Sequence, residues 1–263
     1  QRTVAQLKAL RNSISTLQQL ELALEECSLL FTSVHTQTKA LSLCRQVFEI
    51  SKNSLVSAVN GPARKKAHRF HSKVSRMLGI WTGELRAEST STVIDKYMDP
   101  AITTTANEDS KTSAHFALAK YMDSLYCTYY DRINSAEWHE MVTNRQKYRE
   151  EVELLQEHSG NSKSTRKRIN YLSQLIQHDE AEAQNIEENM KTWLLRSAKQ
   201  YMECLRVHGN GELSTYEDLT TTAVVRLLGL LLKNPTNHQL HKAVRQQLPE
   251  LHVKLFVPFV QQI

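Results

Sequence analysis

The sequence contains few glycines and prolines, which break helices, and few cysteines, which can form disulfides. Seven glycines and five prolines are a small number among 263 residues, and long segments contain neither. Because Gly and Pro are the least favourable residues in helix interiors, their scarcity favours long helices. The four cysteines, at positions 27, 44, 127 and 204, form no CxxC pair and no Cys/His spacing suited to zinc. We therefore expect reduced thiols that pack as small hydrophobic residues in an intracellular protein.

Long apolar runs and a strong net charge are also missing. The longest apolar run, residues 223–232, is interrupted by Arg226 and is too short to cross a bilayer. The 33 basic and 28 acidic residues give a net charge of +5, which by itself does not indicate nucleic acid as a partner. The chain begins at Gln1 without Met or a signal-peptide pattern and ends in an apolar helical pattern. From this we expect a segment of a longer protein.

Apolar residues recur at three- and four-residue steps along most of the chain, which is the period of an amphipathic helix. The pattern predicts helices over about 4–24, 36–59, 63–87, 114–133, 136–158 and 166–207. The last would be about 60 Å long at 1.5 Å per residue, which leaves open a kink near 178–182. Ser89 is expected to cap a short helix that ends before Pro100. Residues 103–113 and 158–165 are predicted loops.

Further helices are expected near the C-terminus. A glycine cap at 208–211 ends the long helix, and a capping box at 214–217 opens the next one. Pro235 and Pro249 would each stand in the first turn of a short helix. With about ten helices and no strand, the predicted fold is all-α, an α-solenoid of degenerate tetratricopeptide-like or HEAT-like hairpins. We divide it into N-terminal repeat helices (1–62), helical repeats including the long helix (63–207) and short C-terminal helices (208–263).

Motifs that carry catalysis or bind metals are missing. Glu137-Trp-His139-Glu140 holds half of a zincin signature, but Thr143 stands where the second His is required. The glutamates at 180, 182, 187 and 188 lack the Glu-x-x-His partners of a di-metal bundle, so a solvated acidic face is preferred. There is no glycine-rich phosphate loop and no protein-kinase motif. We therefore expect a non-catalytic chain without cofactor or metal.

Two sets of residues could indicate nucleic-acid binding. The first is a candidate basic surface of six residues without an intervening acid: Arg64, Lys65, Lys66, Arg69, Lys73 and Arg76. A second basic cluster, at 163–168, opens the long helix. The preferred alternative is a solvated helix face paired with the acidic segments 150–157 or 179–188. The second set is Tyr121, Tyr126, Tyr129 and Tyr130, for which helix spacing favours core packing over base stacking.

A family resemblance rests on motifs in a fixed order over about 79–205. They are Gly79-Ile-Trp81, residues 92–97, Leu118-Ala119, Asp123, Tyr126, Ser135, Glu137 and the run 150–158. The series continues toward the C-terminus with residues 198–205 and Phe256-Val-Pro258. Together they resemble the FAT region of the phosphatidylinositol-3-kinase-related protein kinases, most closely the ATM (ataxia-telangiectasia-mutated) type.

The resemblance implies a helical scaffold clamped around a C-terminal serine/threonine kinase domain, which it regulates, and a parent protein that forms a homodimer. The parent would be nuclear, would act in DNA double-strand-break signalling and telomere maintenance, and would use ATP and magnesium in a kinase domain outside this chain. Asp123, Tyr126, Ser135 and Glu137 form the candidate structural motif at the elbow between paired helices. Partners would be that kinase domain and other helical repeats, with no membrane. The alternatives are a freestanding adaptor for a protein partner, or a nucleic-acid binder acting through 64–76.

Overall fold

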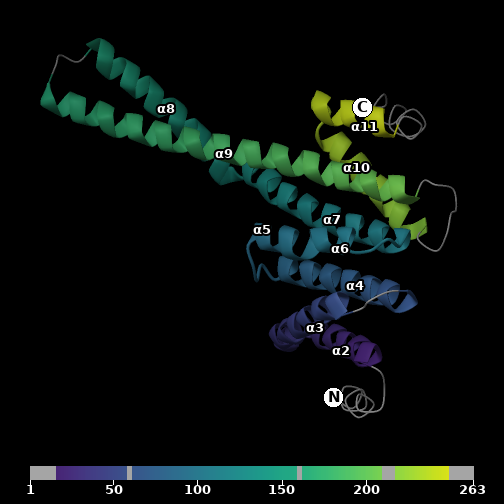
Figure 1. The fold of residues 1–263 in the computed structure, drawn as a ribbon. Helices are drawn as coiled ribbons and strands as arrows, with labels where there is room; N and C mark the ends of the chain where they lie inside the picture. The colour runs from purple at the N-terminus through teal and green to yellow at the C-terminus, as the bar shows by residue number, and fades with distance from the viewer. Residues whose placement is uncertain (1–15, 58–60, 159–161, 209–216, 249–263) are drawn as a thin grey trace. The chain divides into compact units, whose positions relative to one another are not determined.

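The computed structural model describes residues 16–57, 61–158, 162–208 and 217–248, and over these ranges it is helical and contains no strand (Figure 1). The expected all-α class is confirmed. The chain divides into two compact units. Residues 1–121 and 198–263 form the first unit, and residues 122–197 form the second. The sequence-based division at 62/63 and 207/208 stays a prediction.

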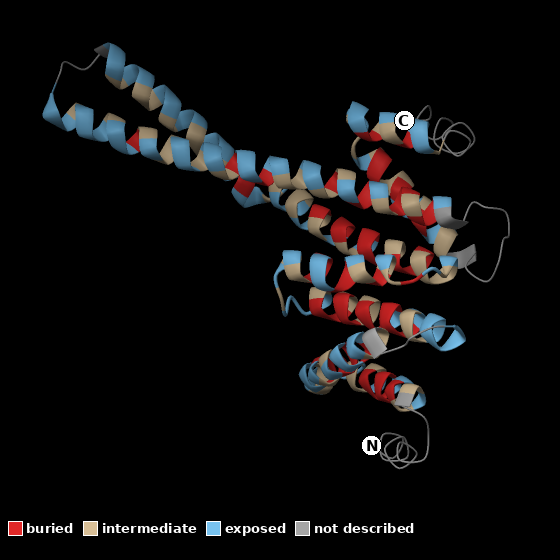
Figure 2. Cartoon of the chain, viewed as in Figure 1, coloured by how far each residue is buried: buried red, intermediate tan, exposed pale blue. Residues whose placement is uncertain are grey.

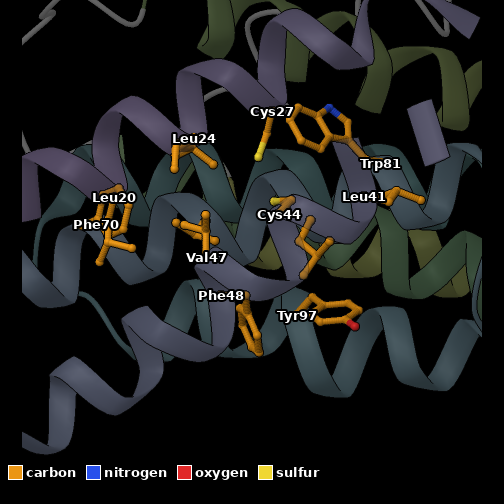
Figure 3. Close-up of a cluster of buried hydrophobic side chains, with 13 residues drawn as sticks. Leu20, Leu24, Cys27, Leu41, Cys44, Val47, Phe48, Phe70, Trp81 and Tyr97 are labelled. Atoms are coloured by element: carbon orange, nitrogen blue, oxygen red, sulfur yellow. The ribbon is translucent and has the colours of Figure 1, made fainter. Parts of the chain in front are cut away.

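The first unit begins with helices that pack in chain order, and Figure 2 shows their buried positions in red. Helix α2 (Thr16–Phe31) and the short 3₁₀ turn η2 (Val34–Thr36) lead into α3 (Gln37–Ser57), which contacts both α2 and α4 (Pro62–Glu84). Figure 3 shows the core that these helices share. It consists of Leu20, Ala23, Leu24, Cys27, Leu41, Cys44, Val47, Phe48, Phe70, Val74, Leu78, Trp81 and Tyr97. Burying one large apolar side chain contributes about 1.5–3 kcal/mol, so this cluster holds the consecutive hairpins together.

The chain continues in helical form through Pro100, where the sequence predicted a stop. Ser89 accepts a hydrogen bond from the Thr92 amide at the start of α5 (Thr90–Thr92), as expected. A π-helical turn, η3 (Val93–Met98), then leads directly into α6 (Asp99–Thr103). The Asp99 amide bonds to the carbonyl of Ile94, five residues back. A proline inside an α-helix clashes with a carbonyl four residues earlier, and we attribute the continuation to this wider turn.

Two glycines on α4 allow neighbouring segments to approach closely. A Cβ atom added at Gly79 would lie 2.9 Å from Met98 Sδ, and one at Gly83 would lie 2.7 Å from Cε2 of Tyr121. The two glycines are four residues apart and therefore share a helix face. This face of α4 has no side chain at either position, so the Met98 side chain and the Tyr121 ring can contact the helix backbone closely.

Helix α7 (Glu108–Ile133) begins earlier than predicted, inside the expected loop 103–113. Asn107 Oδ1 accepts a hydrogen bond from the Ser110 amide at 2.9 Å, and Glu108 and Asp109 occupy the first turn. An Asn cap and two acids at a helix N-terminus stabilise the start, and the sequence interpretation gave this signal too little weight. Farther along α7, the Phe116 ring packs edge-on against Tyr201 with centroids 6.1 Å apart.

The C-terminal helices of the first unit are α10 (Glu217–Lys233) and α11 (His238–Gln247). Helix α11 starts three residues after Pro235, where Asn237 Oδ1 accepts from the Leu240 amide. The side-chain cap at Asn237 therefore sets the start, and Pro235 lies in the preceding turn. The glycines at 209 and 211, residues 214–216 of the capping box and the helix predicted after Pro249 lie outside the described residues.

The second unit contains the end of α7, all of α8 (Ala136–His158) and α9 up to residue 197. The predicted bounds of α8 are confirmed. Helix α9 (Lys163–His208) has 46 residues and is continuous through 178–182, so the helix has no break at the position where the sequence leaves a kink open. Trp138, Ala183 and Ile186 form a small core, against which Tyr129, Ile133 and Met141 pack. This core joins α7, α8 and α9 within the unit.

Candidate functional site

The predicted motif residues occupy two different places in the second unit. Ser135 caps α8, because its Oγ accepts a hydrogen bond from the Trp138 amide at 3.2 Å. Glu137 is exposed, and its pKa lies below its usual range because its own backbone amide and the Ser135 hydroxyl donate to the carboxylate, with Arg132 adding attraction. Ser135 and Glu137 therefore meet at the elbow between α7 and α8.

Asp123 and Tyr126 lie farther back, inside α7. Tyr126 is fully buried, with its ring tilted against Tyr130 at 5.7 Å, and Cys127 Sγ is 3.8 Å from Asp123 Oδ1. The structure thus buries this pair within α7 rather than placing it at the turn. Tyr129 packs on the Trp138 core, so the burial of Tyr126 and Tyr129 fits core packing. Whether the four motif residues act together stays a prediction.

Charged residues connect α8 to α9 along the second unit. Arg168 Nε donates to Glu151 Oε1 at 2.8 Å, and Arg149 pairs with Glu180. Arg132, at the end of α7, lies 3.6 Å from Glu182. The acidic segments 150–157 and 179–188 thus have basic partners in their own unit. The pairs are about half exposed, so each adds little to the stability of the hairpin.

The α4 basic face, defined as Arg64, Lys65, Lys66, Arg69, Lys73 and Arg76, lies on the N-terminal part of α4. All are exposed except Arg76, which is half-buried. Lys73 Nζ is 3.6 Å from Glu25 Oε1 on α2, and Arg64 Nε donates to His68 Nε2 at 3.4 Å. Among the residues that the structure describes, no carboxylate lies within 4.0 Å of Lys65, Lys66 or Arg69. This part of the face therefore carries uncompensated charge.

A polar cluster that the sequence interpretation missed links α3 to the π-turn. Glu88 Oε1 accepts from Arg45 Nη2 at 2.8 Å and from the Tyr97 hydroxyl at 2.9 Å. Tyr97 is fully buried, and burial followed by the neighbouring Glu88 carboxylate raises its pKa to about 12. The phenol therefore stays protonated and donates. Tyr97 falls in the stretch 92–97 of the family resemblance, but nothing local marks Arg45 or Glu88 as its partners.

A buried Ser–His pair lies beside this cluster. His71 Nδ1 is 2.7 Å from Ser51 Oγ, and the Ser51 hydroxyl donates to the Phe48 carbonyl at 2.8 Å. Ser51 Oγ therefore accepts a hydrogen bond from Nδ1–H, which fixes the histidine tautomer. Burial, followed by Lys52 and His68, lowers the pKa of His71 to about 4. Since the hydroxyl proton is committed to a carbonyl, this arrangement serves packing and does not activate a nucleophile.

The cysteines behave mostly as expected. Cys27, Cys44 and Cys204 are buried, and Cys127 is half-buried. Figure 3 shows Cys27 and Cys44 in the shared core. A hydrogen bond to Cys27, followed by burial, raises the pKa of Cys44, and burial raises that of Cys204 to about 12. The Cys44 and Cys204 thiols therefore stay protonated and pack as small apolar groups.

The described part of the chain holds no group of three or more His, Cys, Asp or Glu side chains that could bind a metal ion. His139, from the half zincin signature, is exposed. No helix within the described ranges is long and apolar enough to cross a membrane.

The sequence was compared with known protein families and with curated proteins. No protein-family model matches the sequence. The "Serine/threonine-protein kinase ATM" of Arabidopsis thaliana is 22% identical over 206 residues, which is 73% of this chain and 5% of that protein. The "Serine-protein kinase ATM" of Sus scrofa is 23% identical over 252 residues, 92% of this chain and 8% of that protein. The chain thus spans less than a tenth of the length of these relatives.

Fold and similarity together define the class: an all-α chain related to the phosphatidylinositol-3-kinase-related protein kinases. Within that class, the relationship is to serine/threonine kinases of the ATM type. The relationship covers most of the chain, and it does not by itself single out the FAT region.

Proposed function

We propose that this chain is a non-catalytic FAT-type helical scaffold that packs against and regulates the kinase domain of an ATM-like serine/threonine protein kinase. The observation that carries the proposal is the similarity to two ATM kinases over 73% and 92% of the chain. Two further features support it. The described residues form consecutive helical hairpins, and Gly79, Trp81 and Tyr97 of the ordered motifs are buried where α4 meets its neighbours.

The setting of the proposed scaffold follows from the resemblance. It would act in the nucleus, in DNA double-strand-break signalling and telomere maintenance, as part of a homodimeric kinase. Its partners would be the kinase domain and other helical repeats of the same protein. ATP and magnesium would be bound by that kinase domain.

Binding in trans tests the proposal. The tagged chain would be immobilised and exposed to an ATM-type kinase domain, with an unrelated α-helical repeat of similar length as the control. We expect stable capture by the chain and none by the control. A monomeric, helical chain that captures no kinase domain would contradict the proposal and favour a freestanding adaptor.

A further inference from the structure

Five of the six residues of the α4 basic face form one stripe on the solvent side of the helix, whereas Arg64 faces another side and donates to His68. Lys65, Arg69 and Lys73 are spaced four residues apart, so they lie one above another and span about 12 Å. Lys66 and Arg76 flank this row. Phe70, Val74 and Leu78 occupy the opposite side and are buried in the core that α4 shares with α2 and α3. The core thus fixes which way the stripe faces.

This stripe opposes the stability of its own helix. Like charges four residues apart repel each other by a few tenths of a kcal/mol, and α4 has no acidic residue in its first turn. Positive charges near a helix N-terminus are also unfavourable, because the helix dipole is positive there. Within the described residues, Lys73 has a carboxylate partner in Glu25, whereas Lys65, Lys66 and Arg69 have none. These three charges therefore form no ion pair that stabilises the described fold.

The composition around the stripe discriminates between partners. Protein–protein interfaces have an apolar, charge-depleted centre, whereas nucleic-acid interfaces are polar and strongly positive. The exposed large apolar residue on α4 is Leu85, at the cap of its far end, and none lies among 62–77. The stripe also lacks an exposed aromatic ring, because Phe70 is buried, so it offers no platform for stacking single-stranded bases.

We propose that the α4 basic face docks on the phosphate backbone of double-stranded DNA without reading its sequence. Duplex DNA carries one negative charge per about 1.7 Å of axis, so about seven phosphates pass along the 12 Å of the Lys65–Arg69–Lys73 row. Binding would relieve the repulsion within the stripe by supplying the counter-charge that the fold omits. This proposal does not depend on the regulatory scaffold proposed above.

Salt-dependent binding of a 30-base-pair duplex to the 263-residue chain tests it, with fluorescence anisotropy as the readout. The triple variant Lys65→Gln, Lys66→Gln, Arg69→Gln is compared with Lys147→Gln, Lys163→Gln, Lys167→Gln. The second triple removes the same charge from exposed positions of the other unit. The first triple should weaken binding about tenfold or more at 100 mM salt, and should make the slope of log K against log salt shallower by about 2–3. The second should change binding less than about twofold.

Two results would overturn the proposal. One is equal weakening by both triples, which would show that net charge and not the α4 stripe attracts DNA. The other is the absence of duplex binding at 50 mM salt. Binding of polyglutamate under the same conditions would then assign the face to an acidic protein. Thermal unfolding is the folding control, since the α4 triple should keep or raise the wild-type midpoint by removing repulsion.

Discussion

At the scale of single residues, the close packing at Gly83 gives the clearest test of the described fold. An alanine there would place its Cβ 2.7 Å from the rigid Tyr121 ring. Overpacking costs about 1–3 kcal/mol and exceeds the gain in helix propensity of at most about 1 kcal/mol. We expect Gly83→Ala to lower the free energy of unfolding by about 1–2 kcal/mol in urea denaturation.

Gly229 on α10 is the matched control for this substitution. A Cβ atom at Gly229 meets nothing within 4 Å, so Gly229→Ala should stabilise the chain by about 0.5–1 kcal/mol. Gly79→Ala should cost less than Gly83→Ala, because the Met98 side chain it meets is flexible. A Gly83→Ala variant as stable as Gly229→Ala would contradict the packing described here.

His71 predicts a specific dependence of stability on pH. Its pKa is about 4 in the folded chain and about 6.5 when unfolded, so between these values the unfolded chain binds more protons. Stability therefore rises with pH across this window and is lost as pH falls from 6.5 to 4, by at most about 3 kcal/mol. Urea denaturation measures the difference in free energy of unfolding between wild type and His71→Gln. This difference should shrink as pH falls from 6.5 to 4. An advantage that stays constant with pH would contradict the buried, neutral imidazole.

Residue-level contacts mark the limit of what the sequence could reveal. The burial of Tyr126 and the isolated cysteines followed from helix periodicity. The Arg45–Glu88–Tyr97 cluster did not, because its members are 43 and 9 residues apart and meet only when α3 and the π-turn pack together. Gly79 belongs to a motif of the sequence analysis and Gly83 does not, and the close approach at both positions depends on Met98 and Tyr121, which come from other segments.

At the scale of elements, charge complementarity orders the α8–α9 hairpin. Arg168 bonds to Glu151 through both Nε and Nη2, at 2.8 and 3.0 Å. We expect Arg168→Glu alone to lower the free energy of unfolding only slightly, because solvent screens this half-exposed pair. The exchanged double variant, Arg168→Glu with Glu151→Arg, should recover most of the loss in a double-mutant cycle by urea denaturation. If the double variant loses the sum of the single losses, the pair does not couple the two helices.

Helix bounds could be predicted wherever capping and periodicity agreed. Ser135 and the apolar pattern after it located α8 correctly. Pro100 misled the interpretation, because a proline stop is a rule for regular α-helices and the chain forms a π-turn before it. The polar composition of 103–113 predicts a loop, but α7 starts inside it because Asn107 caps the helix and two acids occupy its first turn.

At the scale of the whole molecule, composition and helical periodicity together predict the all-α class, since few residues break helices and apolar residues recur at three- and four-residue steps. Composition did not indicate what the chain does. The ordered motifs connected it to ATM-type kinases, and the similarity to two such kinases over most of its length supports that connection. How the helices would meet a kinase domain depends on surfaces outside this chain, so sequence periodicity cannot supply it.

The most direct test of the regulatory account is the phosphorylation rate of a Ser-Gln peptide by an ATM-type kinase domain titrated with this chain. We predict a saturable change in rate with the wild-type chain. A rate that stays constant at every concentration of a folded, monomeric chain would contradict the account.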